Sequence, residues 1–194
     1  MQPTHCRGLR SIMQPSILES MERKSFAEMH CSVAQCLEVV GEWWSMLIVR
    51  DAMLGVTRFD QFQERLGISR NILRQRLDNL TGHGVLEKVS YSDHPPRYEY
   101  RLTPKGQDLG PVVTTMRQWG DKYAAPDGPP LQLVHERCGT AFHAEMTCSN
   151  CGERVPAREV RVVPGPGDFD RLLDIRASRT DDRESSPGPR TLLA

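Results

Sequence analysis

Residues 69–81 read SRNILRQRLDNLT, and this stretch decides the fold. At 100° per residue, Leu73, Leu77 and Leu80 share one face of a helix, which predicts that this face packs on a core. Ser69 is a predicted N-cap, because its hydroxyl can accept a hydrogen bond from a free N–H of the first turn. The opposite face is polar and consists of Asn71, Arg74, Gln75 and Asp78, with Arg70 at its margin.

The segments around this helix predict a winged helix-turn-helix. Upstream lies a short helix over residues 59–66, which Gly67 ends. Downstream, strand-like runs over 85–91 and 97–102 flank Ser-Asp-His-Pro-Pro, a hairpin tip that we expect to stay unpaired because proline donates no ladder hydrogen bond. Such an order places the second motif helix in the major groove of DNA. The predicted fold is mainly α with a small β-hairpin wing.

Three more helical segments complete the predicted domain. Apolar residues recur at helical spacing over 31–40 and 43–54, and a glycine follows each segment. Thr103-Pro104 begins the third segment, within which Gly110-Pro111 predicts a kink or a restart. The last part of this segment is strongly amphipathic, and its apolar residues are Leu109, Val112, Val113, Met116, Trp119 and Tyr123.

The chain is electrically balanced, but its charges are unevenly distributed. The 194 residues include 25 Lys and Arg against 25 Asp and Glu, so the net charge is zero. Residues 65–105 contain eight basic and four acidic residues, a local excess of +4 (8 − 4). A local positive surface is enough to displace counterions from phosphates, so the neutral total does not exclude a nucleic-acid partner.

The polar face of the 69–81 helix carries side chains that can recognise bases. In the major groove, Arg pairs with two acceptors of guanine, and Asn or Gln pairs with adenine. Residues at the helix N-terminus or in the hairpin are better placed for phosphates or for the minor groove. The candidate DNA-binding residues are Ser69, Arg70, Asn71, Arg74, Gln75, Lys88, Arg97 and Arg101. The alternative is that an Arg-rich outer face is simply solvated.

Four runs of the chain resemble the HxlR-type family of transcriptional regulators. They are CSVAQCLEVVGEWWSMLIVRD (31–51), FDQF (59–62), GISRNILRQRL (67–77) and YEYRLTPKG (98–106). The resemblance implies a MarR-like winged-helix homodimer with its DNA-reading helix at 69–80. It also implies that the first helix and the 109–123 helix carry much of the dimer contact. Because a two-fold dimer binds two half-sites about one helical turn apart, the implied operator is near-palindromic.

A second, zinc-ribbon-like β module is predicted over residues 131–163. Two pairs of metal-ligand residues, each with a two-residue gap and a following glycine, are separated by nine residues. This spacing is typical of two tight turns that close a tetrahedral N/S₃ site on a structural Zn²⁺ ion. The predicted ligands are His135, Cys138, Cys148 and Cys151, with His143 as an alternative ligand and disulfides or unligated thiols as alternative states.

The remaining parts of the chain and its first helix complete the prediction. We expect a disordered N-terminal extension (1–24), a DNA-binding and dimerisation domain (25–124) and a disordered tail (164–194). Cys31 is a candidate redox thiol, because a helix N-terminus favours thiolate and because some members of the resembled family sense oxidants with a matching cysteine. The alternative is a small apolar residue packed at the helix start. Cys36 is expected in the core.

The sequence contains no catalytic pattern. It has no Gly-rich phosphate loop, nucleophile elbow or HExxH motif, so we expect no enzyme. No apolar run approaches the ~20 residues of a membrane span and no secretory signal is present, which predicts a cytoplasmic protein without membrane contact. The leading interpretation is a sequence-specific transcriptional regulator that binds double-stranded DNA as a homodimer, and we favour a repressor over an activator. The alternatives are a zinc-ribbon-bearing module whose winged helix binds protein, and a thiol-based redox sensor that controls DNA binding.

Overall fold

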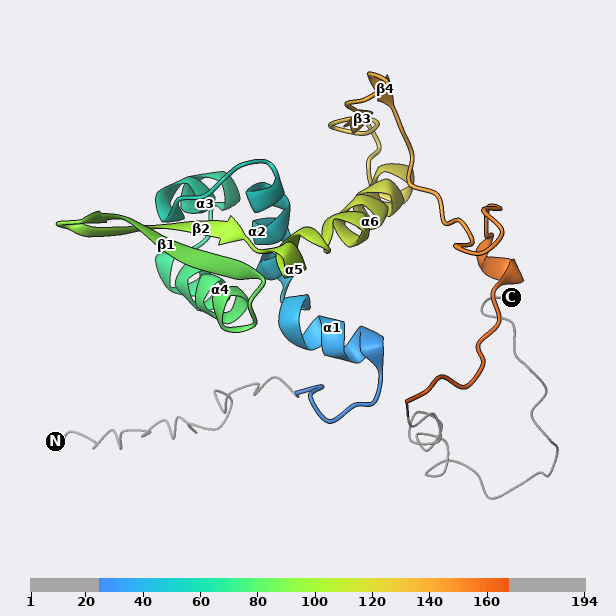
Figure 1. The fold of residues 1–194 in the computed structure, drawn as a ribbon. Helices are drawn as coiled ribbons and strands as arrows, with labels where there is room; N and C mark the ends of the chain where they lie inside the picture. Colours follow the sequence, from blue (N-terminus) through green and yellow to red (C-terminus); the bar gives the residue numbers. More distant parts are fainter. Residues whose placement is uncertain (1–24, 168–194) are drawn as a thin grey trace, which may run out of the picture.

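The computed structural model describes residues 25–167 and consists of a helical domain with a two-stranded wing, followed by an extended C-terminal segment (Figure 1). The predicted extension 1–24 and nearly all of the predicted tail 164–194 lie outside the described residues. The domain contains α1 (Ser32–Val40), α2 (Trp43–Met53), α3 (Phe59–Leu66), α4 (Arg70–Gly82), β1 (Leu86–Asp93), β2 (Pro96–Leu102), α5 (Pro104–Gln107) and α6 (Gly110–Tyr123). None of the helices in this part of the chain is long and apolar enough to cross a membrane.

The core of the domain forms around the apolar face of α4. Leu73, Leu77 and Leu80 have no exposed surface, so the prediction from their spacing is confirmed. They pack with residues of α2, of α3 and of the base of the wing. The buried apolar residues of this core are Val40, Ile48, Val49, Val56, Phe62, Ile68, Leu73, Leu77, Leu80, Val85, Leu86 and Tyr100.

The turn between α3 and α4 has the local chemistry that the sequence predicts. Gly67 ends α3 with a φ of 65°, in the left-handed region where a side chain would strain the backbone. Ser69 caps α4, and its Oγ accepts a hydrogen bond from the Ile72 N–H at 3.3 Å. Gly67 and Ser69 therefore mark the end of α3 and the start of α4.

A buried carboxylate, which the sequence analysis did not identify, links α2 to α3. Asp51 is fully buried and accepts hydrogen bonds from Arg50 Nε at 3.0 Å and from Arg65 Nε of α3 at 3.4 Å. Because a buried carboxylate needs such partners, this contact favours one placement of α3 on α2.

The wing is an antiparallel hairpin attached to the helical core near its base. Its register runs from Leu86 opposite Leu102 to Asp93 opposite Pro96, with an irregularity between Ser90 and Ser92. The expectation of an unpaired tip is therefore wrong, because Asp93 and Pro96 lie within the strand pair. Pro96 lacks an N–H but keeps a carbonyl acceptor, so a proline at this end of a two-stranded hairpin is tolerated.

Helix α6 is separated from the core by the short helix α5. Thr103 caps α5, with its Oγ1 accepting from the Gly106 N–H at 3.2 Å, and a new helix begins at Gly110 as predicted. Gly106 is the last buried residue in the described chain, and α6 contains none. In Figure 1, α1 and α6 both extend from the core on the side away from the wing tip.

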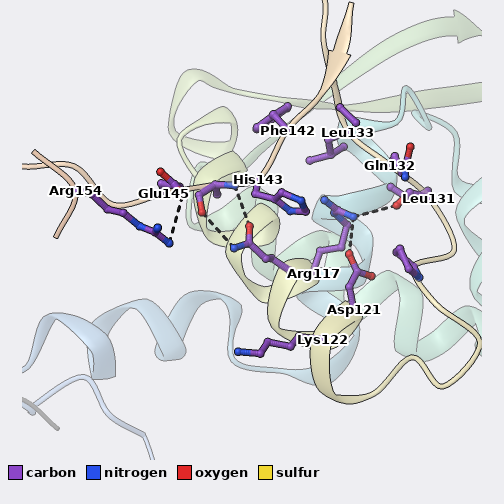
Figure 2. Close-up of a pocket in the computed structure, with 14 residues that line it drawn as sticks. Arg117, Asp121, Lys122, Leu131, Gln132, Leu133, Phe142, His143, Glu145 and Arg154 are labelled. Carbon is purple, nitrogen blue, oxygen red and sulfur yellow. Dashed lines mark hydrogen bonds and ion pairs between the residues drawn. The ribbon is translucent and has the colours of Figure 1, made fainter. Parts of the chain in front are cut away.

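The C-terminal segment contains little regular structure. It consists of the strand pair β3 (Val134–His135) and β4 (Thr140–Ala141) and the 3₁₀ turn η1 (Ala157–Glu159). Two contacts attach it to α6: Gln118 exchanges two hydrogen bonds with the backbone of Ala144, at 2.9 and 3.2 Å, and Arg117 donates to the Leu131 carbonyl at 3.0 Å (Figure 2). These short elements do not by themselves make up the predicted zinc-ribbon module.

Candidate nucleic-acid interface

The outer face of α4 is exposed and polar. Asn71, Arg74 and Gln75 are all exposed, on the side of the helix opposite the buried leucines. Within residues 25–167, the side chains of Arg74 and Gln75 form no hydrogen bond or ion pair. Their donors and acceptors are therefore available to a ligand, and the helix that carries them is fixed at its N-terminus by the Ser69 cap and along its length by the core.

Arg70, at the first position of α4, is directed back onto α3. Its guanidinium lies 3.2 Å from Asp60 Oδ1 and 3.0 Å from Gln63 Oε1, and stands over the Phe59 ring at 4.8 Å. The Arg70 and Asp60 side chains are both exposed, so their ion pair is weak and can be exchanged for a phosphate. The helix N-terminus beside it also favours an anion.

Charged residues of the wing form a small network around Glu99. Arg101 donates to Glu99 Oε2 at 2.8 Å, and Arg58, just before α3, donates to Oε1 at 3.4 Å. The pKa of Glu99 lies below its ordinary value, and the largest cause is the hydrogen bond from Arg101. Burial acts in the opposite direction, and the hydrogen bond from Arg58 lowers the pKa further. Arg58 also stands over the Tyr91 ring at 4.8 Å. The carboxylate of Glu99, opposite Val89 in the middle of the hairpin, thus holds two cations on the wing.

Two further wing cations are free of acidic partners in the described chain. Lys88 lies over the Tyr98 ring, with its Nζ 4.2 Å from the ring centroid. Arg97 is exposed, and its side chain forms no hydrogen bond or ion pair with the described residues. Both are therefore in a state that can contact phosphate.

An open hollow of about 690 Å³ separates α3 and the start of α4 from the wing. Four of the predicted DNA-binding residues line it, namely Arg70, Arg74, Lys88 and Arg97. Arg58 lines it too, and the sequence analysis missed this residue. Ser69, Asn71, Gln75 and Arg101 lie outside the lining, on α4 and on β2. The structure thus gathers five cations around one hollow.

The floor of this hollow includes a neutral phenol. Burial raises the pKa of Tyr100 above its ordinary value, and the Asp78 carboxylate contributes in the same direction, while Arg74 acts against it. Tyr100 therefore keeps its proton at neutral pH and can act as a hydrogen-bond donor. Asp78 adds a negative charge to the same wall.

The four predicted metal ligands lie in two separate pairs. Cys138 Sγ is 3.4 Å from His135 Nδ1. Hydrogen bonds from the backbone of Cys151, then of Asn150, lower the pKa of the Cys148 thiol, which also interacts with the Cys151 side chain. Among residues 25–167, no three His, Cys, Asp or Glu side chains form a group that could hold a metal ion. The two pairs are formed but are not joined into one site.

The other residues singled out from the sequence lie on or beside α6 and α1. His143, the alternative ligand, lines an open hollow of about 500 Å³ between α6 and the C-terminal segment (Figure 2). Cys31 is the half-buried N-cap of α1. Cys36 is exposed, so the expectation of a core position is wrong for the single chain. The apolar side of α1 that carries Val33 faces away from the core.

A capped helix with a free polar face, a β-hairpin wing and a hollow lined by cations define a winged helix-turn-helix protein. Comparison with known proteins agrees: residues 39–128 match the model of the family described as HxlR-like helix-turn-helix. An uncharacterised HTH-type transcriptional regulator of Mycobacterium tuberculosis is 46% identical over 137 residues, which cover 70% of this chain and 87% of that protein. The chain belongs to the HxlR-like helix-turn-helix family.

Solved structures extend the similarity beyond the family region. The proposed transcription factor PA1607 is 41% identical, with a TM-score of 0.66 over 73% of this chain and 100% of that chain. The proposed transcription factor PA1374 from Pseudomonas aeruginosa is 39% identical, with a TM-score of 0.55 over 74% of this chain and 99% of that chain. Both matches cover more of this chain than residues 39–128 do. The proteins that this chain resembles are thus described as helix-turn-helix transcriptional regulators or transcription factors.

Proposed function

We propose that the protein is a cytoplasmic, sequence-specific transcriptional repressor that binds a near-palindromic DNA operator as a homodimer. The observation that carries this proposal is the exposed face of α4, where Arg74 and Gln75 are free of partners in the described chain. Arg and Gln are the side chains suited to guanine and adenine edges in the major groove. The core holds this helix rigidly, so its reading face is preorganised.

The cations around the hollow suit the DNA backbone on either side of such a helix. With α4 in the major groove, Arg70 lies at the start of that helix and Arg58 lies just before α3, while Lys88 and Arg97 lie on the wing. Contacts of this kind position the protein, whereas contacts from α4 specify the sequence. Each neutralised phosphate adds about 0.9 to the negative slope of log K against log salt.

The proposed homodimer rests on apolar surface that the single chain leaves exposed. Helices α1 and α6 both carry large exposed apolar side chains. They are Val33 and Leu37 on α1 and Met116, Trp119 and Tyr123 on α6. Apolar surface gathered in this way is typical of protein interfaces. A two-fold axis through these helices would present two copies of α4 to successive major grooves, which requires a near-palindromic operator.

The direct test is selection of bound duplexes from a random pool by the full-length protein, followed by a salt titration of the best one. We expect a two-fold symmetric motif and a steep loss of affinity with salt. Arg74→Ala and Gln75→Ala should each relax the choice of base at one position per half-site, at a cost of about 1–3 kcal/mol for the preferred base.

Matched variants away from the interface serve as controls. Arg158→Ala in η1 and Gln107→Ala in α5 remove exposed side chains of the same kinds and should leave both motif and affinity unchanged. If no duplex is enriched, or if Arg74→Ala and Gln75→Ala bind with unaltered sequence preference, α4 does not read DNA. A winged helix that binds protein would then be favoured.

A further inference from the structure

The two halves of the C-terminal segment contain the same tight turn. In the first, the Gly139 N–H donates to the His135 carbonyl at 2.8 Å; in the second, the Gly152 N–H donates to the Cys148 carbonyl at 2.8 Å. The two glycines have φ of 68° and 75°, in the left-handed region. In each turn the potential ligands occupy the first and fourth positions, and the glycine follows the fourth. The two ligand pairs therefore share a backbone conformation as well as a sequence spacing.

Each turn also lies at the end of a short antiparallel pairing. The first is closed by β3 and β4, with His135 opposite Thr140. The second is closed by the pairing of Thr147 with Arg154 and by the Cys148 N–H, which donates to the Glu153 carbonyl at 2.8 Å. Two ligand-bearing turns on two short hairpins are the parts from which a zinc ribbon is assembled.

The side chains within each turn are arranged as metal ligands require. Cys138 Sγ and His135 Nδ1 are 3.4 Å apart, close to the separation of two ligands on one tetrahedral ion. The backbone N–H groups of Asn150 and Cys151 donate hydrogen bonds to Cys148 Sγ, which orients the sulfur within the second turn. Cys138 and Cys151 are exposed, so an ion can reach both pairs.

The segment has no apolar core to hold the two hairpins together. No residue from 107 to 167 is buried. Its attachments to α6 through Gln118 and Arg117 involve Ala144 and Leu131 rather than either turn. A module of this size without a core needs another source of folding free energy, and a bound metal ion is the usual one.

We propose that His135, Cys138, Cys148 and Cys151 bind one structural Zn²⁺ ion per chain and that the ion joins the two turns. The pairs are not joined in the described structure. The nine-residue connection between them can span roughly 30 Å when extended, so its length does not prevent them from meeting. Binding forms one Zn–N and three Zn–S bonds and releases the thiol protons, with no change of oxidation state. Because the protein fills all four positions, no site remains for a reactive water.

The experiment titrates the full-length, metal-free, reduced protein with Zn²⁺ and, separately, with Co²⁺. We expect one equivalent per chain, and for Co²⁺ the thiolate charge-transfer and d–d absorption of a tetrahedral sulfur-rich site. His135→Ala, Cys138→Ser, Cys148→Ser and Cys151→Ser should each abolish stoichiometric binding. The matched controls Cys36→Ser and His143→Ala should keep it, and the second also tests the alternative histidine ligand.

Circular dichroism and thermal melting of each variant show whether the winged domain is intact, since none of its buried residues lies in the segment. Zinc should increase the protection of residues 131–163 against proteolysis and leave the melting of the domain little changed. Absence of stoichiometric binding, binding that survives loss of two of the four ligands, loss of binding in His143→Ala, or a Cys148–Cys151 disulfide in the isolated protein would each overturn the assignment. None of these readouts depends on DNA.

Discussion

Asp51 is the residue on which the placement of α3 depends most directly. Its carboxylate is fully buried, while its partners Arg50 and Arg65 remain 42% and 51% exposed. Replacement by alanine leaves both guanidinium groups free to return to water, so the loss is that of two charge-assisted hydrogen bonds and a small volume. We expect Asp51→Ala to lower the free energy of unfolding by about 2 kcal/mol, measured by urea denaturation.

Asp60→Ala is the matched control at this scale, because Asp60 also pairs with an arginine but its side chain is 84% exposed. Its loss should change stability within experimental error, since exposed ion pairs contribute little. Equal effects of the two substitutions would mean that burial of Asp51 has no energetic consequence.

Glu99, in the middle of the wing hairpin, provides a second prediction for a single residue. Because its pKa is lowered chiefly by Arg101, the carboxylate favours the folded state above its ordinary pKa, and this contribution is lost as the pH falls through the lowered value. In Arg101→Ala we expect the pKa of Glu99, followed by carboxyl NMR, to rise toward its ordinary value. Arg158→Ala should leave it unchanged, and an unaltered pKa in Arg101→Ala would contradict the assigned cause.

Among the elements, the junction between the wing and α5 tolerates the least change. A Cβ on Gly106 would overlap the Val85 carbonyl oxygen and approach Leu102 Cδ2 to 2.8 Å. Since one of these neighbours is backbone, α5 must move away from the wing. We expect Gly106→Ala to destabilise the domain by about 1–3 kcal/mol in thermal or urea unfolding.

Gly82, the last residue of α4, is the matched glycine. No atom lies within 4 Å of a Cβ built there, so Gly82→Ala should be neutral or raise stability by up to about 1 kcal/mol. A destabilised Gly82→Ala together with an unaffected Gly106→Ala would show that the packing at α5 is not the cause.

The elements also show which features a sequence can predict. The burial of Leu73 and Leu77 and the cap at Ser69 follow from helical periodicity and local hydrogen bonding, both encoded within a few residues. The contact of Arg58 with Glu99 joins residues 41 positions apart, and no local pattern encodes such a pair. The pairing at the wing tip was missed for a different reason: the rule about proline concerns donors, and Pro96 can still pair through its carbonyl. Cys36 shows a third limit, because helical spacing alone does not show which positions of a helix the rest of the domain covers.

For the molecule as a whole, the distribution of exposed apolar residues is informative. Val33 on α1 is 67% exposed, and Met116 and Trp119 on α6 are 55% and 64% exposed. A single small domain gains nothing from these side chains, whereas a two-fold partner would bury them. The proposed dimer therefore accounts for the surface that the core leaves uncovered, and α1 and α6 lie opposite the wing tip, where a partner does not obstruct the DNA-binding side (Figure 1).

The prediction at this scale is that the double variant Met116→Glu with Trp119→Glu is monomeric. Buried carboxylates without partners oppose association, while the helical core stays intact because α6 contributes no buried residue to it. Light scattering after gel filtration should give the 22.0 kDa of one chain instead of twice that mass. Affinity for a full operator should fall at least ~100-fold while affinity for a single half-site is retained, since only the linked dimer gains from the second half-site. Leu54→Glu, an exposed apolar position outside α1 and α6, is the control and should remain dimeric. A monomeric wild-type protein would contradict the proposed dimer. A double variant that still dimerises would show that the dimer forms through another surface.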